Sequence, residues 1–103
     1  MEFEELPGFT RRMMALMGDD EFAQLQAALL LNPGAGKLIP HSGGLRKLRW
    51  AGRSRGTRGG LRVIYYWWVS DSVISLLAIY SKSRKDDLSA AELRLLRQII
   101  ESD

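Results

Sequence analysis

The residues best suited to chemistry in this 103-residue chain are cationic, and they are concentrated in one stretch. Between Glu21 and Asp71 the sequence has no carboxylate. The same stretch carries eight positive charges, from Lys37, Arg46, Lys47, Arg49, Arg53, Arg55, Arg58 and Arg62. Because the whole chain has a net charge of only +3, the remainder sums to −5. Charge segregated in this way favours binding of a polyanion.

Lysine and arginine are the groups available for chemistry on such a ligand. His41 is the only histidine and lies in a stretch rich in Gly and Pro. If the polyanion is RNA, its cleavage by its own 2′-hydroxyl needs a proton acceptor, stabilisation of charge at phosphorus and a proton for the leaving 5′-oxygen. Neither a pair of histidines nor a carboxylate of the basic stretch can supply them. Arg49 and Arg62 stay protonated, so we expect them to bind and neutralise phosphate.

Lysine is the remaining candidate for proton transfer. Lys47 is two residues from Arg49, and Lys82 is followed by Arg84 and Lys85. Crowding by cations favours the neutral form of a lysine, which can accept a proton. The alternative is that Lys47 and Lys82 are ordinary solvated lysines that supply only charge.

Hydrophobic patterning predicts the elements that position these residues. Phe3 fits a short first strand, and apolar residues then recur at helical spacing over 9–17 and 22–30. After a predicted loop at 34–44, residues 45–50 alternate, with Leu45, Lys47 and Arg49 on one face. Residues 61–69 are apolar on both faces and predict a central strand, paired with a strand over 73–82.

A C-terminal helix completes the predicted fold. Ser89 and Glu92 have the spacing of a capping box, and we expect Ala91, Leu95, Leu96 and Ile99 to form the buried stripe of the helix. The sequence thus predicts one small α+β domain over residues 1–103, with an antiparallel sheet, two N-terminal helices and a C-terminal helix.

Composition excludes several classes of site. The chain has no cysteine, which rules out disulfides and thiolate metal sites, and we expect neither a metal nor another cofactor. The N-terminus is acidic, unlike a signal peptide, and the apolar runs are far shorter than the ~18 residues that a membrane span needs. We therefore expect a soluble, cytoplasmic protein with no membrane partner.

Three segments together resemble the RelE/ParE superfamily of toxins from bacterial type II toxin–antitoxin systems, most closely its HigB-like branch. They are GGLRKLRW (43–50), RGGLRVIYY (58–66), and IYSK (79–82) followed by DDLS (86–89). The resemblance implies a RelE-like fold and a metal-independent endoribonuclease, an mRNA interferase that cleaves message on the ribosome and inhibits translation. It implies as partners the ribosome, mRNA and a cognate antitoxin, of a HigA-like helix-turn-helix type.

The resemblance also implies roles for individual residues. The catalytic residues it implies are Lys47, Arg49, Arg62, Tyr80 and Lys82. The residues implied to bind RNA or the ribosome are Arg46, Arg53, Arg55, Arg58, Arg84 and Lys85; the alternative for the loop arginines is a solubilising loop. No tyrosine follows Tyr80, and Lys82 stands where other members have arginine, so the group that protonates the leaving oxygen stays open.

The resemblance also favours one strand register. If Val69 pairs with Val73, Arg62 lies opposite Tyr80, and Lys82 shares their face. A register shifted by one residue would place Arg62 opposite Ser81 and turn Lys82 away. We expect the first register, because the family resemblance puts Arg62 and Lys82 at the same phosphate.

Three alternatives remain at this stage. The aromatic run at 65–68 favours core packing in a central strand, with base stacking as the alternative. Members of the same superfamily inhibit DNA gyrase and cleave no RNA, and fold does not separate the two activities. A non-catalytic RNA-binding module is the third possibility. The basic residues on the strands and loop favour the ribonuclease.

Overall fold

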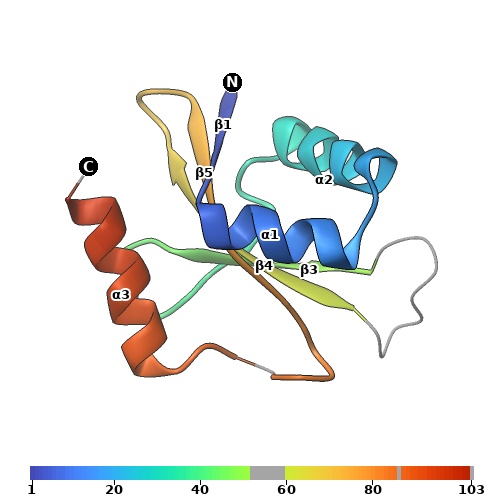
Figure 1. Cartoon of the computed structure of the whole chain (residues 1–103). Coiled ribbons are helices and arrows are strands. Elements are labelled where there is room, and N and C mark those ends of the chain that lie inside the picture. Colours follow the sequence, from blue (N-terminus) through green and yellow to red (C-terminus); the bar gives the residue numbers. More distant parts are fainter. Residues whose placement is uncertain (52–59, 86, 103) are drawn as a thin grey trace.

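The computed structural model describes residues 1–51, 60–85 and 87–102 (Figure 1). Its elements follow in the order β1 (Glu2–Glu5), α1 (Pro7–Leu16), α2 (Asp19–Leu31), β2 (Lys37–Leu38), β3 (Arg46–Trp50), β4 (Leu61–Trp68), β5 (Val73–Ser81) and α3 (Ala90–Glu101). The predicted α+β class, with two N-terminal helices and a C-terminal helix, is confirmed. No helix in the described part of the chain is long and apolar enough to span a membrane.

The five strands form one sheet in the order β1-β5-β4-β3-β2. β4 is central, as its apolar run predicts. β1 runs parallel to β5, whereas the other neighbours are antiparallel, so the expectation of a wholly antiparallel sheet is wrong at this edge. The expected loop at 34–44 also contains the edge strand β2. A strand of two residues is too short to show alternation, so its sequence pattern gives no signal.

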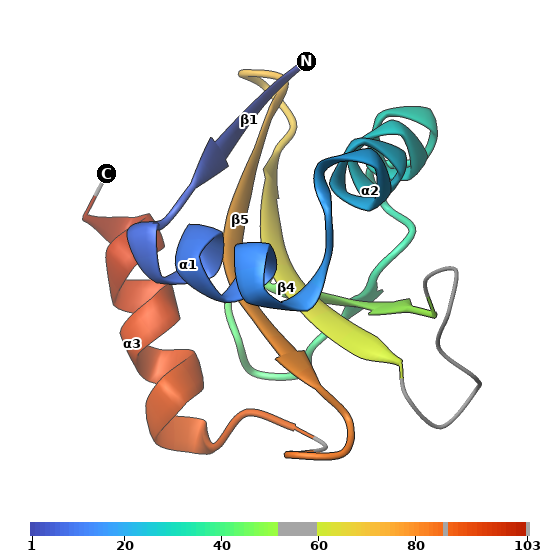
Figure 2. The same cartoon turned by 45° about the vertical axis from the view of Figure 1, so that its right-hand side comes forward.

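The helices cover opposite faces of the sheet (Figures 1 and 2). One core layer joins α1 and α2 to the sheet and includes Phe9, Met13, Leu25, Leu29, Val63, Tyr65 and Leu76. The other layer lies under α3 and includes Leu45, Ile64, Leu77, Leu93, Leu96 and Ile100. We call the side of the sheet under α3 the α3 face. Leu45, just before β3, packs in this layer, and since side chains alternate along a strand, Lys47 and Arg49 of β3 share the α3 face.

A β-bulge sets the register between β4 and β5. Near the turn Trp68 pairs with Val73, so the expected Val69–Val73 pair is wrong and the turn is longer than predicted. Further along, Tyr65 pairs with Leu76 but Ile64 pairs with Ala78, which leaves Leu77 as the extra residue. The pairing beyond the bulge brings Arg62 opposite Tyr80, as predicted.

The start of α3 is fixed by the predicted capping box. The Glu92 backbone N–H donates to Ser89 Oγ at 3.1 Å, and the Ser89 N–H donates to Glu92 Oε1 at 2.8 Å. The predicted buried stripe is right for Leu96 but wrong for Ala91, Leu95 and Ile99, which are exposed. Leu95 and Ile99 are 61% and 41% exposed, while Leu93, Leu96 and Ile100 face the sheet.

Replacing Ser89 with alanine is expected to lower the free energy of unfolding by about 1 kcal/mol, because the Glu92 backbone N–H loses its acceptor, Ser89 Oγ, at the helix start. Urea unfolding followed by circular dichroism measures the change. Ser70→Ala, in the exposed β4–β5 turn, is the matched control and should change stability by less than about 0.5 kcal/mol. Equal stability of both variants would contradict the capping role.

Candidate nucleic-acid interface

A row of polar side chains crosses the α3 face near the end of β5. Arg49 of β3 pairs with Arg62 of β4, and Arg62 pairs with Tyr80 of β5. Directly paired side chains on one face of an antiparallel sheet are about 5 Å apart at Cβ. The sheet thus brings together three of the five predicted catalytic residues, from three different strands.

Two lysines form a neighbouring row on the same face. Lys37 of β2 pairs with Lys47 of β3, and Lys47 pairs with Ile64 of β4. Lys47 and Arg49 are two residues apart on β3, so both rows belong to one cationic surface. Lys37 was counted in the basic stretch but not predicted as a site residue, because the short strand that positions it was not recognised.

Lys82 continues the register one residue beyond β5. Its backbone N–H donates to the Gly60 carbonyl at 3.0 Å, which extends the β4–β5 pairing that joins Arg62 to Tyr80. The parity of this pairing assigns Lys82 to the face of Arg62 and Tyr80. The Lys82 side chain is exposed.

Arg62 is the buried member of the group, with only 6% of its surface exposed. Its Nη1 donates to the Leu61 carbonyl over a long 3.4 Å, and among the described residues no carboxylate forms an ion pair with it. Gly60 makes room for the guanidinium, since a Cβ there would lie 3.3 Å from Nη1. A buried cation to which the described residues give no ion pair is costly, so this arrangement favours an anionic ligand.

A carboxylate joins the cationic surface from the segment that follows β5. Lys47 Nζ donates to Asp87 Oδ1, and the two side chains form an ion pair. This hydrogen bond, with the positive charges of Lys47, Arg62 and Arg49, lowers the pKa of the Asp87 carboxyl from its ordinary value. Carboxylates were considered from the sequence only within the basic stretch between Glu21 and Asp71, which does not include Asp87. A carboxylate distant in sequence reaches the site through the turn after β5.

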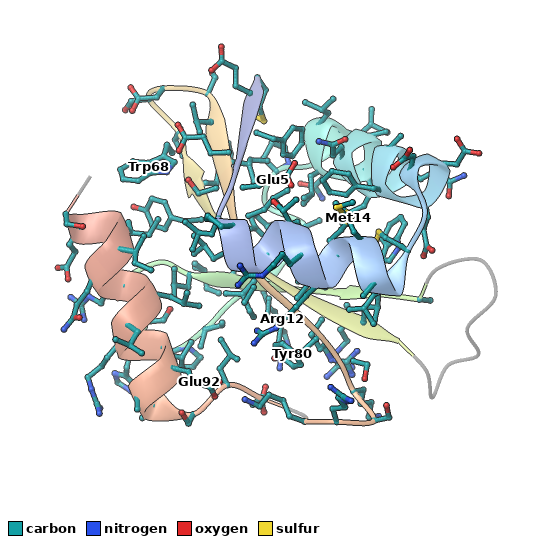
Figure 3. The ribbon with its side chains drawn as sticks, in the orientation of Figure 1. Glu5, Arg12, Met14, Trp68, Tyr80 and Glu92 are labelled. Atoms are coloured by element: carbon teal, nitrogen blue, oxygen red, sulfur yellow. The ribbon has the colours of Figure 1, made fainter. Side chains whose placement is uncertain are left out.

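Two hollows flank this surface and share Tyr80 and Leu88. The smaller, of about 350 Å³, has Lys37, Lys47 and Asp87 in its wall. The larger, of about 530 Å³, lies between α1, β5 and the start of α3. Figure 3 shows Arg12, Tyr80 and Glu92, which contribute to its wall from these three elements. Tyr80 thus stands between two cavities, one lined by Lys47 and the other by Arg84 and Lys85.

The structure separates Arg46 from the predicted interface. Arg46 pairs with Tyr65, a residue of the core under α1 and α2, so it points to the opposite face from Lys47. Its Nη1 donates to the carbonyls of Gly36 at 2.8 Å and Gly34 at 3.2 Å. The prediction that Arg46 binds RNA is not supported by this position, because the guanidinium instead holds the segment before β2.

Arg46→Ala is therefore expected to lower the free energy of unfolding by about 2 kcal/mol, because it removes charged hydrogen bonds to two backbone carbonyls. The exposed Arg49 of the same strand provides the matched control, and Arg49→Ala should cost less than about 0.5 kcal/mol. Urea unfolding of both variants checks the contrast. Equal stabilities would show that the Arg46 contacts do not hold this segment.

The remaining predicted binding residues fall into two groups. Lys85 Nζ contacts both carboxylate oxygens of Glu92, at 2.8 and 2.7 Å, so its charge is paired at the start of α3. Arg84 is exposed beside it. Arg53, Arg55 and Arg58 lie outside the described residues.

The aromatic run divides by face. Tyr65 is fully buried, and its hydroxyl donates to the Pro33 carbonyl at 2.7 Å and accepts from the Gly36 N–H at 2.8 Å. Trp67 packs on the same core, and Tyr66 packs under α3. Trp68 is half-buried and bonds to Ser75 Oγ. The prediction of core packing is therefore confirmed for Tyr65, Tyr66 and Trp67.

The described residues contain no group of three or more His, Cys, Asp or Glu side chains placed to hold a metal ion. What the site offers is a set of fixed cations, one tyrosine and one carboxylate. A comparison of the chain with models of known protein families found no match.

Proposed function

We propose that this protein is a ribosome-dependent mRNA endoribonuclease of the RelE/ParE type, acting as the toxin of a toxin–antitoxin pair. The observation that carries the proposal is the row Arg49–Arg62–Tyr80, in which a buried arginine without a carboxylate partner among the described residues meets an exposed arginine and a tyrosine. Such a row fits a phosphate whose charge increases during reaction. The sequence resemblance supplies the ribosome and message as the substrate.

The proposed reaction is a transesterification within the RNA strand. The 2′-oxygen attacks phosphorus and gives up its proton, the bond from phosphorus to the 5′-oxygen breaks, and the 5′-oxygen takes up a proton. The products are a 2′,3′-cyclic phosphate and a 5′-hydroxyl end. Arg49 and Arg62 would neutralise the phosphate oxygens throughout, since arginine stays charged.

The contacts of Lys47, Lys82 and Tyr80 suggest which of them supplies charge and which transfers protons. Lys47 donates a hydrogen bond to Asp87, so it takes part as a cation and contributes charge. Lys82, exposed at the end of the row, and Tyr80, paired with Arg62, would transfer protons to and from the ribose and leaving oxygens. Binding of message on the ribosome would provide the orientation that the small site lacks.

The proposed substrate also implies the location and the partner. Message on translating ribosomes is cytoplasmic, so the protein would act there. A toxin of this kind needs an antitoxin, and the gene beside this one is expected to encode a small protein with a helix-turn-helix region. A neighbouring gene of that kind would support the pairing.

Mapping the ends of a defined message in a translation extract tests the activity. The proposal predicts new 5′-hydroxyl ends within the reading frame when protein and ribosomes are both present, and none with either alone. Intact message would overturn it. Intact message together with inhibited supercoiling by DNA gyrase would identify the gyrase-directed alternative instead.

A further inference from the structure

The carboxylate of Asp87 lies where an anionic ligand of the cationic surface would bind. It reaches Lys47 of β3 from the segment between β5 and α3, forty positions later in the chain. Among the described residues, Asp87 is the carboxylate that contacts the rows formed by Lys37, Lys47, Arg49 and Arg62. Arg62 and Arg49 are also close enough to affect its ionisation. One carboxylate thus experiences the three cations that the proposed reaction assigns to phosphate.

Carboxylate and phosphate oxygens make the same kind of bond with these side chains. Each is an anionic acceptor for lysine and arginine donors. The Asp87 carboxylate and an RNA phosphate cannot both bind the Lys47 ammonium group, because the two anions would repel each other. Bound RNA must therefore either avoid Lys47 or displace Asp87.

The position of the pair makes displacement inexpensive. Asp87 is 69% exposed, whereas Lys47 is 22% exposed and held on a strand paired on both sides. An exposed ion pair contributes little to stability, so a released carboxylate returns to water at small cost. The backbone of Lys47 is held because β3 lies between β2 and β4.

We propose that Asp87 is an internal competitor for nucleic-acid phosphate, which occupies Lys47 in the free protein and leaves it when single-stranded RNA binds. The proposal rests on the proposed function for the class of ligand, and it adds a carboxylate that sets the affinity of the site. Until RNA binds, the ion pair with Asp87 keeps the charge of Lys47 neutralised.

The exchange has a thermodynamic signature. A lysine that binds phosphate normally releases a condensed counterion, which makes affinity fall with salt by a slope of about 0.7 per contact for a single strand. When Asp87 already neutralises Lys47, the exchange releases a carboxylate rather than a salt ion. Removing the carboxylate charge should therefore tighten binding and also steepen its dependence on salt.

Fluorescence anisotropy with a labelled single-stranded RNA carrying 2′-O-methyl groups tests this, because that probe binds but cannot be cleaved. For Asp87→Asn we expect the Kd at low salt to fall about fivefold, the upper range for an exposed pair. The slope of log Kd against log salt should steepen by about 0.7. Asp71→Asn is the matched control: it makes the same change of charge in the exposed turn at the far end of β4 and β5. It should change Kd by less than about twofold and leave the slope unchanged.

A second pair of variants assigns the effect to Lys47. In a Lys47→Gln background, Asp87→Asn should no longer tighten binding or alter the slope, because the lysine that both anions use is absent. Circular dichroism melts of every variant establish that each is folded. Equal or weaker binding by Asp87→Asn would overturn the exchange, as would an unchanged slope or an effect that persists without Lys47.

The binding assay contains neither ribosomes nor a cleavage step, so its outcome is separable from the outcome of message mapping. If message is cleaved but wild type and Asp87→Asn bind RNA with equal affinity, the exchange is overturned and the proposed nuclease activity is supported. Tighter binding by Asp87→Asn with intact message would support the exchange and overturn the nuclease.

Discussion

Arg62→Ala is expected to lower ribosome-dependent cleavage of message by at least about 100-fold, the usual loss when one fixed group that stabilises transition-state charge is removed. Arg62 is buried between Arg49 and Tyr80, so water cannot substitute for its charge in an equivalent position. Quantitative primer extension at fixed times measures the rate. We expect Lys82→Ala to abolish toxicity as well, through loss of proton transfer.

Arg11→Ala is the matched control for the loss of an arginine, since Arg11 is exposed on α1, which packs on the opposite face of the sheet. It should cleave at nearly the wild-type rate. Arg62→Lys retains the charge but not the planar fork, and an intermediate rate is expected. Circular dichroism and retained binding of the antitoxin show that each variant is folded. A folded Arg62→Ala or Lys82→Ala protein with wild-type cleavage would contradict the joint site.

Affinity for ribosomes is expected to fall about 50-fold between 50 and 200 mM monovalent salt. This value assumes four phosphate contacts, by Lys37, Arg49, Arg62 and Lys82, each with a slope of about 0.7. Lys47 is left out because Asp87 already neutralises it. Sedimentation of the protein with ribosomes over a salt series gives the slope.

A magnesium concentration that keeps the ribosomes intact throughout the series is the necessary control. The triple variant Lys37→Gln, Arg49→Gln, Lys82→Gln should bind more weakly and with a much flatter slope, because three of the assumed contacts are removed. Affinity that is unchanged across the salt range would show that the cationic surface does not bind phosphates.

Features that depend only on residues close together in the sequence were predictable from the sequence. The capping box formed because Ser89 and Glu92 are three positions apart, whatever surrounds the helix. The alternation over 45–50 placed Lys47 and Arg49 on one face, since strand geometry repeats every two residues. The apolar character of 61–69 likewise identified the central strand, because a strand buried on both faces has no polar side.

The Arg62–Tyr80 pair was predicted correctly, although the turn pairing from which it was derived is wrong and the bulge was not predicted. The prediction assumed that Val69 pairs with Val73, whereas the real turn begins one residue earlier and the bulge at Leu77 compensates for the difference. A bulge depends on how β5 bends over its neighbours, and Leu77 and Ala78 both pack under α3. The family resemblance pointed to the right pair, while turn geometry alone did not.

Charge segregation, the strands that carry it and the cap of the last helix were determined by the sequence, because each depends on residue type and short spacing. Only the tertiary structure decided which further charged residues join Lys47 and Arg49 on this surface and which basic residue leaves it. It turned Arg46 toward the segment before β2, added Lys37 through a two-residue strand and brought Asp87 onto Lys47. These contacts join positions ten to forty residues apart, and such distant pairs are selected by the packing of the whole sheet rather than by any local pattern.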